Sequence, residues 1–342
     1  MEITIKGNNF ISSYASIIID GHLFVSDLVY HALYEIDLNS NMARLCGVFK
    51  SDSRHKFVFQ NRDELWWIPE SNKSTSIDIY NMKSMEFESV SLSKESKYDD
   101  NCRFSGVFRD EIDHSIVWCI PCCASLILKI NTEMRSIDTV PLGFELSEKN
   151  TILISSIRDV NNIYACKKNN ADIYRFKKND GFECIYHNSN IKCENNMILA
   201  FDNTFYLVPR KLNNPWIAVD KNGDNEELID FGIDNDLDCY TEVQFGDVVW
   251  AIPYLGDVLY RFDLKDRAVE GIPVKTKDGR ASLNYWISYK DEKKAILTSV
   301  DDLTPFVLMN KEGVEKEISV SDASRDLEVL LARIDIIDRE WK

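Results

Sequence analysis

The sequence predicts an all-β fold, a seven-bladed β-propeller whose blades are four-stranded antiparallel sheets. Three observations predict it: one strand motif recurs seven times at intervals of 42 to 52 residues, a second apolar strand follows each copy, and turn signals separate the strands. The motif consists of five residues in order: an apolar residue, an aromatic residue, any residue, an apolar residue and Pro. Some copies lack one or more of these residue types. Its copies occupy residues 23–27, 65–69, 117–121, 163–167, 205–209, 249–253 and 296–300.

Each unit divides into four strands in chain order. A first apolar strand precedes the motif, at residues 14–19, 56–60, 104–108, 152–157, 197–201, 242–245 and 285–289. The motif is the second strand, and the third follows the Pro position, at residues 33–37, 76–80, 127–131, 173–177, 216–220, 259–263 and 306–310. A polar turn then leads to a fourth, alternating strand, for example at residues 135–140, 268–274 and 314–320. Turns such as Asn179-Asp180-Gly181 favour hairpins, because Gly accepts a positive φ.

Repeated four-stranded units of this length are typical of propellers. A sheet that is apolar on both faces cannot cover itself, whereas a closed ring of such sheets buries both faces between neighbours. Aromatic side chains in the motif suit the wedges between blades, and these are Trp66, Trp118, Tyr164, Tyr206 and Trp250. We therefore predict a single propeller domain over residues 1–321.

The two ends of the chain fall outside the repeat. We expect residues 2–6 to form a strand that helps to close the ring by pairing with the last blade. Residues 322–342 predict a short amphipathic helix packed on the propeller, because apolar residues recur near a period of 3.6 and Ser324 can cap it. A further strand is the alternative, since Ile334-Asp335-Ile336 alternates.

The composition excludes several classes of protein. Hydrophobic residues make up 44% of the 342, which is typical of a folded chain and not of a disordered one. The 56 acidic and 40 basic side chains leave a net charge of −16, which argues against binding to nucleic acid or to an anionic membrane. Every apolar stretch is far shorter than a membrane-spanning helix, which needs about 20 residues. The N-terminus lacks the charged-then-apolar pattern and the cleavage site of a secretory signal. We expect a cytoplasmic monomer.

Two patterns resemble metal sites, but we predict no metal and no cofactor. Cys119, Cys122 and Cys123 are spaced like the start of a zinc site, yet no second Cys or His pair completes four ligands, so packing inside a strand is the favoured interpretation. The alternating residues Asp234, Asp236 and Asp238 could hold Ca²⁺, but an acidic, solvated loop is favoured in so acidic a chain. Residues 220–224 look like the start of a calcium loop and are interpreted as a hairpin.

No motif indicates catalysis. The five histidines are dispersed, and none stands in a recognised motif: His22, His31, His55, His114 and His187. The sequence also lacks a nucleophile elbow, a phosphate-binding loop and a zinc-protease motif. For any one of these histidines, a surface or capping role is the favoured interpretation.

At the level of its repeats, the chain resembles the bacterial seven-bladed propellers of the broad Kelch-like and WD40-like group. The repeated Trp-x-Ile-Pro strand followed by Tyr-x-Phe-Asp carries this resemblance, for instance at residues 250–253 and 260–263. The chain lacks the paired glycines of Kelch strands and the Trp-Asp dipeptide of WD40 blades. The resemblance therefore implies a fold, and it assigns no functional residue.

Propellers commonly bind partners on the face that carries the second-to-third-strand loops and the blade-to-blade loops. The predicted ligand-binding residues on that face are Tyr30, His31, His55, Arg210 and Tyr254. We expect a non-catalytic binding or scaffold propeller that recognises a protein, a peptide or a glycan. The alternative is a glycan-active lyase or hydrolase with its site at the mouth of the central channel.

Overall fold

The computed structural model describes residues 3–5, 11, 13–28, 31–51, 54–70, 76–92, 104–122, 126–144, 153–159, 162–178, 180–190, 193–234, 240–253, 256–276, 285–299 and 305–319. The regular structure within these ranges consists of β-strands. The described ranges hold no helix with the length and apolar character that a membrane crossing requires. The tail at 322–342, for which the sequence predicts a helix, lies outside the described residues.

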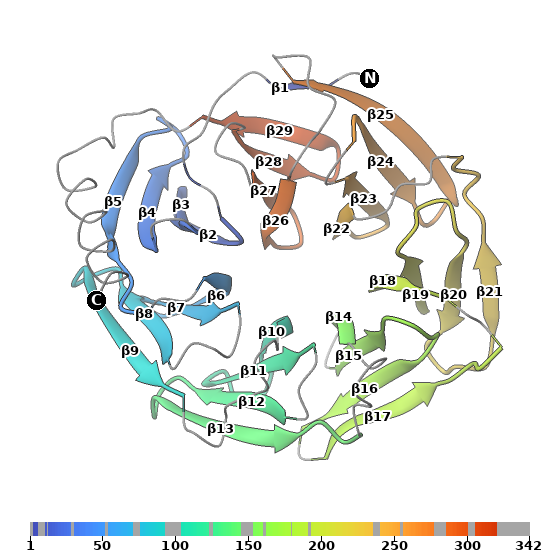
Figure 1. The fold of residues 1–342 in the computed structure, drawn as a ribbon, viewed down its shortest axis with the longest axis horizontal. Helices are drawn as coiled ribbons and strands as arrows, with labels where there is room; N and C mark the ends of the chain where they lie inside the picture. Colours follow the sequence, from blue (N-terminus) through green and yellow to red (C-terminus); the bar gives the residue numbers. More distant parts are fainter. Residues whose placement is uncertain are drawn as a thin grey trace, which may run out of the picture.

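Seven four-stranded antiparallel sheets stand as blades around a central axis, as the repeat predicts (Figure 1). Blade one contains β2 (Ala15–Ile19), β3 (His22–Ser26), β4 (Ala32–Asp37) and β5 (Ala43–Val48). Blade two contains β6 (His55–Asn61), β7 (Glu64–Pro69), β8 (Ser76–Asn81) and β9 (Glu86–Ser91). Blade three contains β10 (Phe104–Arg109), β11 (Ile116–Pro121), β12 (Leu126–Asn131) and β13 (Ser136–Pro141).

The remaining blades follow the same order. Blade four contains β14 (Leu153–Asp159), β15 (Asn162–Lys167), β16 (Ile173–Lys177) and β17 (Gly181–Tyr186). Blade five contains β18 (Asn195–Phe201), β19 (Thr204–Pro209), β20 (Trp216–Asp220) and β21 (Glu226–Ile229). Blade six contains β22 (Tyr240–Phe245), β23 (Val248–Pro253), β24 (Val258–Asp263) and β25 (Ala268–Thr276). Blade seven contains β26 (Tyr285–Lys290), β27 (Ala295–Ser299), β28 (Phe306–Asn310) and β29 (Gly313–Ile318).

In every blade the first strand lies nearest the axis and the fourth lies at the rim (Figure 1). Because the strands are antiparallel, the second-to-third-strand connections and the blade-to-blade connections lie at one end of the ring. We call this end the loop face. The two hairpin turns of each blade lie at the opposite end, which we call the turn face.

The buried side chains of the described residues form seven clusters, and each cluster joins two neighbouring blades. Trp66 belongs to the cluster between blades two and three, and Trp250 to the one between blades six and seven; both are fully buried. The cluster between blades seven and one closes the ring, with Phe306 and Ile296 of blade seven packed against Val25 of blade one. The motif aromatics therefore occupy the wedges that the sequence predicts for them.

The prediction for the N-terminal strand is wrong in its partner. β1 (Ile3–Ile5) pairs in parallel with β25 of blade six, in the register Ile3 to Val274 and Ile5 to Thr276, and not with the last blade. β25 is nine residues long and extends past its pairing with β24, which ends at Pro273. The extension provides the edge that β1 joins, while blade seven already has four strands of its own.

Asp or Asn side chains close most hairpins on the turn face. The residue that ends the third strand accepts hydrogen bonds from amides of the turn in six blades, and these residues are Asp37, Asn81, Asn131, Asp220, Asp263 and Asn310. Blade four differs, because Lys177 ends β16 and Gly181 turns the chain at φ 78°. Asp220 accepts from the amides of Asn222 and Asp224, so the calcium-like segment is a hairpin, as predicted.

Bulges at the start of the first strand tie blades together around the axis. The β-ladder shifts by one residue there in blades two to five. Bulged side chains contact the next blade: Lys56 Nζ donates to the Phe104 carbonyl (3.0 Å), Ser105 Oγ lies 3.0 Å from Ser156 Oγ, and Asn196 Nδ2 donates to the Tyr240 carbonyl (3.0 Å). The inner end of the loop face is therefore held by polar contacts between blades.

Truncation of a motif aromatic should be severely destabilising. Trp250 is fully buried between blades six and seven, and its indole Nε1 donates to the Lys311 carbonyl. We expect Trp250→Ala to lower the free energy of unfolding by about 3–5 kcal/mol in chemical denaturation, because a large cavity forms at a blade interface. Met134→Ala, at a side chain that is 75% exposed, should change it by less than about 0.5 kcal/mol. Equal effects of the two substitutions would contradict packing between blades as the main source of stability.

Candidate functional site

The structure brings together two of the predicted site residues. His31 and His55 lie at the junction of blades one and two, where both contact Phe49: its amide donates to the His31 carbonyl (2.9 Å), and its ring centroid lies 4.2 Å from that of His55. Arg210 lies on blade five at the end of β19, where its guanidinium is 3.8 Å from the Glu194 carboxylate. Tyr30 and Tyr254 lie outside the described residues. The three described residues therefore belong to two separate regions of the ring.

His55 is fully buried and joins blade one to blade two. Its Nδ1 lies 2.9 Å from Ser26 Oγ on β3, and its Nε2 lies 3.1 Å from Asp78 Oδ2 on β8. Ser51 Oγ donates to the same carboxylate oxygen, and the Phe49 ring packs 4.2 Å from the imidazole. These residue types resemble a hydrolase triad, but Ser26 is only 1% exposed, so no substrate reaches its hydroxyl.

The repeat explains why a polar side chain lies there. At several junctions, the side chain of the first residue of the first strand forms hydrogen bonds to the preceding blade. Asn195 of blade five donates from Nδ2 to the carbonyls of Lys167 (2.9 Å) and Asn170 (2.6 Å) in blade four. Tyr240 of blade six donates to the carbonyl of Pro209 in blade five. His55 occupies the same position in blade two, so its contacts fit a structural role, namely to connect blade two to blade one.

Comparison of the seven repeats with one another singles out blade four. Lys167 stands where four other blades have Pro, and Lys177 stands where the other blades have the capping Asp or Asn. A residue that replaces the usual packing or capping residue of the repeat is a candidate for another role. Lys167 belongs to a cluster of polar side chains on the loop face, which we call the Asp172 cluster.

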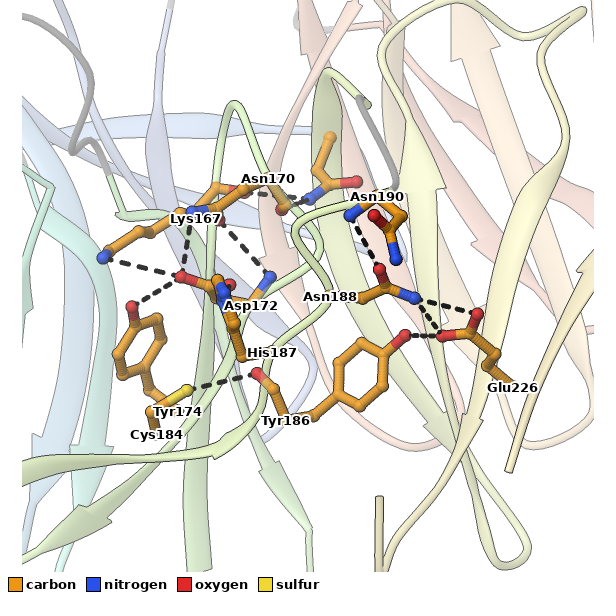
Figure 2. Close-up of polar contacts among 11 residues, drawn as sticks. Lys167, Asn170, Asp172, Tyr174, Cys184, Tyr186, His187, Asn188, Asn190 and Glu226 are labelled. Carbon is orange, nitrogen blue, oxygen red and sulfur yellow. Dashed lines mark hydrogen bonds and ion pairs between the residues drawn. The ribbon is translucent and has the colours of Figure 1, made fainter. Parts of the chain in front are cut away.

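Asp172 is the centre of the cluster (Figure 2). It lies in the connection between β15 and β16 and is 4% exposed. Its carboxylate accepts hydrogen bonds from three groups, Asn170 Nδ2 (2.8 Å), the Tyr174 hydroxyl (2.8 Å) and His187 Nδ1 (2.6 Å), and it forms a longer ion pair with Lys167 Nζ (3.7 Å). The buried charge is therefore both neutralised and hydrogen-bonded, which is the condition for a stable buried carboxylate.

Lys167 is held inward by aromatic rings. Its ammonium lies 4.8 Å from the ring centroid of Phe144 and 4.7 Å from that of Tyr174. Both distances fall within the range of cation–π attraction. The side chain is 13% exposed. Lys167 thus serves mainly to neutralise Asp172 and to brace the connection in which Asp172 lies.

His187 is the exposed member of the cluster. It follows β17 at the start of the connection to blade five, and its side chain is 61% exposed. Because an ionised carboxylate only accepts, the ring nitrogen that faces Asp172 carries the proton, and Nε2 is left as an acceptor in the neutral ring or a donor in the protonated one. A buried carboxylate with three other partners therefore orients one imidazole toward solvent on the loop face.

A second group extends the cluster to blade five (Figure 2). The Tyr186 hydroxyl donates to Glu226 Oε2 on β21, and Asn188 Nδ2 donates to both oxygens of the same carboxylate at 2.7 and 2.9 Å. These hydrogen bonds, that of Tyr186 first, lower the pKa of Glu226, whereas burial and Glu226 raise the pKa of Tyr186 to about 12. The segment that carries His187 is thus fixed on both sides.

The cluster contains no activated nucleophile. Cys184 is an exposed residue as a whole, but its thiol group is partly buried. This burial and the charge of Asp172 raise the pKa of the thiol, so the thiolate is disfavoured. Cys119 is buried in the core between blades two and three, where desolvation raises its pKa strongly. Cys123, Asp236 and Asp238 lie outside the described residues. Among the residues that the structure describes, no three His, Cys, Asp or Glu side chains form a group that could hold a metal ion.

One further carboxyl group stands out near the axis. Glu242 on β22 is 5% exposed and faces blade five, where Asn196 Nδ2 donates to its Oε1. The equivalent residues of blades two, three and five, which also pair with the residue after the motif aromatic, are Val58, Val107 and Ile198. Burial raises the pKa of Glu242 to about 8, although Asn196 and the charge of Lys290 act in the opposite direction. The carboxyl group is therefore mostly protonated at neutral pH.

The sequence-based search missed His187 and Asp172. It placed only His31 and His55 among the histidines on the loop face, and no motif distinguishes His187 from the other four histidines. The available signal was Lys167, which interrupts a position where Pro recurs. The signal for Glu242 was similar, namely an acidic residue at a position that is apolar in the first strands of blades two, three and five.

Comparisons with known proteins identify the fold. No protein-family model matches the chain, and a search of curated protein sequences finds no match. Among solved structures, virginiamycin B lyase from Staphylococcus aureus is 13% identical with a TM-score of 0.63, over 87% of this chain and 97% of that chain. YCF48 from Cyanidioschyzon merolae is 13% identical with a TM-score of 0.63, over 89% and 97%. A structure of YCF48 bound to D1 peptide is 11% identical in sequence with a TM-score of 0.62, over 90% of this chain and 93% of that chain. The TM-scores show that these proteins share the propeller fold, and at sequence identities this low the similarity shows the fold alone.

His55 should make stability sensitive to acid. Burial lowers the pKa of His55 in the folded protein below its ordinary value of 6.5, against the opposing effect of Asp78, so the unfolded chain binds the proton more readily. The wild type should therefore lose free energy of unfolding, relative to His55→Gln, as the pH falls from 7.5 to about 5. Denaturant unfolding at several pH values measures this difference. Parallel pH profiles for the two proteins would contradict a buried neutral imidazole.

Glu242 should have the opposite pH dependence. Its pKa of about 8 in the folded protein lies above the ordinary 4.5, so its contribution to stability is complete below about pH 4.5 and is lost as the pH rises through about 8. We expect Glu242→Gln, which keeps the shape and cannot ionise, to be more stable than the wild type at pH 9, with a difference that shrinks toward pH 5. Thermal unfolding of both proteins across this range is the measurement. A difference that does not vary with pH would rule out a buried, protonated Glu242.

Proposed function

We propose that this propeller is a binding protein that recognises a polypeptide partner on its loop face, at the junction of blades four and five. One observation carries the proposal: the buried Asp172, held by Asn170 and Tyr174, orients the exposed His187 outward where the repeat itself requires no such arrangement. A side chain oriented in advance loses little conformational freedom when it meets a ligand.

The chemistry of the cluster supports binding more than catalysis. His187 is a single acid–base group, and the Cys184 thiol beside the cluster has a raised pKa. Catalysis of hydrolysis or elimination would require a second activated group near the imidazole. The groups on the described surface are instead imidazole, amide and carboxylate side chains already fixed by hydrogen bonds, which suits recognition. The structure of YCF48 with D1 peptide supports peptide recognition as a use to which this fold can be put.

A second candidate is an enzyme with its site at the channel mouth. The observation that favours it is Glu242, a buried carboxyl group with a pKa of about 8, which suits a general acid near neutral pH. Virginiamycin B lyase shares the fold, which supports lyase chemistry on such a ring. On this alternative, Glu242→Gln would abolish turnover and leave partner binding at the Asp172 cluster unchanged.

Site-specific photocrosslinking tests the proposed function. A photoreactive residue in place of the exposed Asn190, beside the Asp172 cluster, should capture a polypeptide from extracts of the source cell in a saturable manner. His187→Ala, introduced in the same protein, should reduce the captured amount roughly tenfold, because it removes the oriented imidazole.

The matched control carries the photoreactive residue in place of Ser84, which is exposed on the turn face of blade two. It should capture nothing that depends on His187. The proposal fails if both positions capture the same polypeptides, or if capture at position 190 is indifferent to His187→Ala.

A further inference from the structure

Exposed apolar side chains are concentrated on one part of the turn face. Among the residues that the structure describes, five large hydrophobic side chains are exposed, and four of them lie in hairpin turns of blades one to three: Met42, Met85, Ile112 and Met134. The fifth, Leu228, lies on β21 of blade five. Single exposed apolar residues are common on soluble proteins, whereas several on adjacent turns indicate an interaction surface.

Blade three presents two of these side chains on turns that are fixed in place. Ile112, which is 88% exposed, lies in the turn between β10 and β11, and its amide donates to the buried carboxylate of Asp110 (2.9 Å). Met134 lies in the turn between β12 and β13. The Ser115 carbonyl of the first turn accepts hydrogen bonds from the amide (2.8 Å) and the hydroxyl (2.9 Å) of Thr132 in the second. The two turns are therefore tied to each other.

An ion pair connects these turns to blade two. Arg135, the residue after Met134, pairs with Glu88 on β9. Met85 is 57% exposed and directly precedes β9, so it lies on the turn that leads into the strand that Arg135 contacts. We call Met85, Ile112 and Met134 the apolar patch. Its three side chains are held on neighbouring turns of two adjacent blades.

Acidic residues predominate around the apolar patch. The hairpin turns of blades two and three, together with the strand residues next to them, occupy residues 61–64, 81–86, 109–116 and 131–136. These segments contain seven acidic and four basic residues, in a chain whose net charge is −16. A partner with Lys and Arg beside its apolar side chains is attracted to such a surface, and an acidic partner is repelled.

The backbone of these turns is already hydrogen-bonded. In the outer turns, the side chains of Asn81 and Asn131 each accept hydrogen bonds from two turn amides, at 2.8 to 3.1 Å. Asp110 does the same in the inner turn of blade three. An extended peptide recognised by strand pairing needs unpaired backbone groups, whereas a helix satisfies most of its backbone groups internally. A helix therefore fits this surface better than an added strand.

We infer that the apolar patch is a second interaction surface, which docks a basic amphipathic helix of a partner protein. The apolar side of the helix contacts Met85, Ile112 and Met134, and its Lys and Arg side chains lie beside the acidic residues around the patch. Methionine suits this role, because its flexible, polarisable side chain adapts to an irregular apolar partner. The patch is on the opposite end of the ring from the Asp172 cluster, so the inference is independent of the proposed function.

Fluorescence anisotropy with labelled synthetic helices tests the inference. The probes are a short Leu-Lys peptide with its leucines on one helical face, a peptide of the same composition whose leucines form no face, and the Leu-Glu counterpart of the first. The amphipathic Leu-Lys helix should bind, and its affinity should fall as salt is raised. The double variant Ile112→Ser/Met134→Ser should weaken its binding roughly tenfold, because it removes two of the three apolar contacts. The other two peptides should bind much more weakly.

The matched control is Leu228→Ser, the same kind of change at the exposed apolar residue of blade five. It should keep the affinity of the wild type, and thermal unfolding should show that all variants fold. The inference is overturned if the amphipathic Leu-Lys helix does not bind, if either of the other peptides binds as well, or if Leu228→Ser weakens binding as much as the double variant. Capture at position 190 on the loop face is measured separately, so failure here leaves the proposed function standing.

Discussion

The packing of apolar sheet faces against neighbouring blades is the interaction on which the rest of this structure depends. Each buried cluster joins two blades, and the cluster between blades seven and one is built in the same way as the others. Among the described residues, no single blade has a buried cluster of its own, so a blade is stable only when both neighbours are present. The ring closes by side-chain packing, and the added strand β1 reinforces the rim of blade six instead of joining the first blade to the last.

This constraint assigns most side chains to structure before any function is considered. A residue that recurs at the same place in several blades, such as a motif aromatic or a capping Asp, has a role that the ring itself requires. Polar residues at repeated positions follow the same rule, because His55, Asn195 and Tyr240 all connect the start of a first strand to the preceding blade. Functional side chains are therefore best sought where the repeats disagree.

The sequence was sufficient to predict the fold because hydrophobic period, turn residues and repeat length all agree. Strand positions follow from local patterns, and the ring follows from the number of units. The partner of β1 could not be predicted, because it depends on how far β25 extends beyond β24, and a three-residue strand has little pattern of its own.

The candidate site was much less accessible to prediction. Asp172 and His187 lie 15 residues apart on either side of a hairpin, and only the pairing of β16 with β17 brings them within 2.6 Å. The burial of His55 is equally invisible in the sequence, since the side chains that cover it come from two blades. The usable signal was the disagreement among repeats at Lys167, which indicates a place but not a chemistry.

Ion pairs on the turn face connect neighbouring blades. On the turn face, many basic side chains in or beside the hairpins pair with an acidic residue of the neighbouring blade: Arg62 with Glu133, Arg135 with Glu64 and Glu88, Arg158 with Glu111, Lys178 with Asp110, Arg267 with Glu227, and Lys311 with Asp247. Exposed pairs of this kind contribute little stability each, but they neutralise the basic side chains involved.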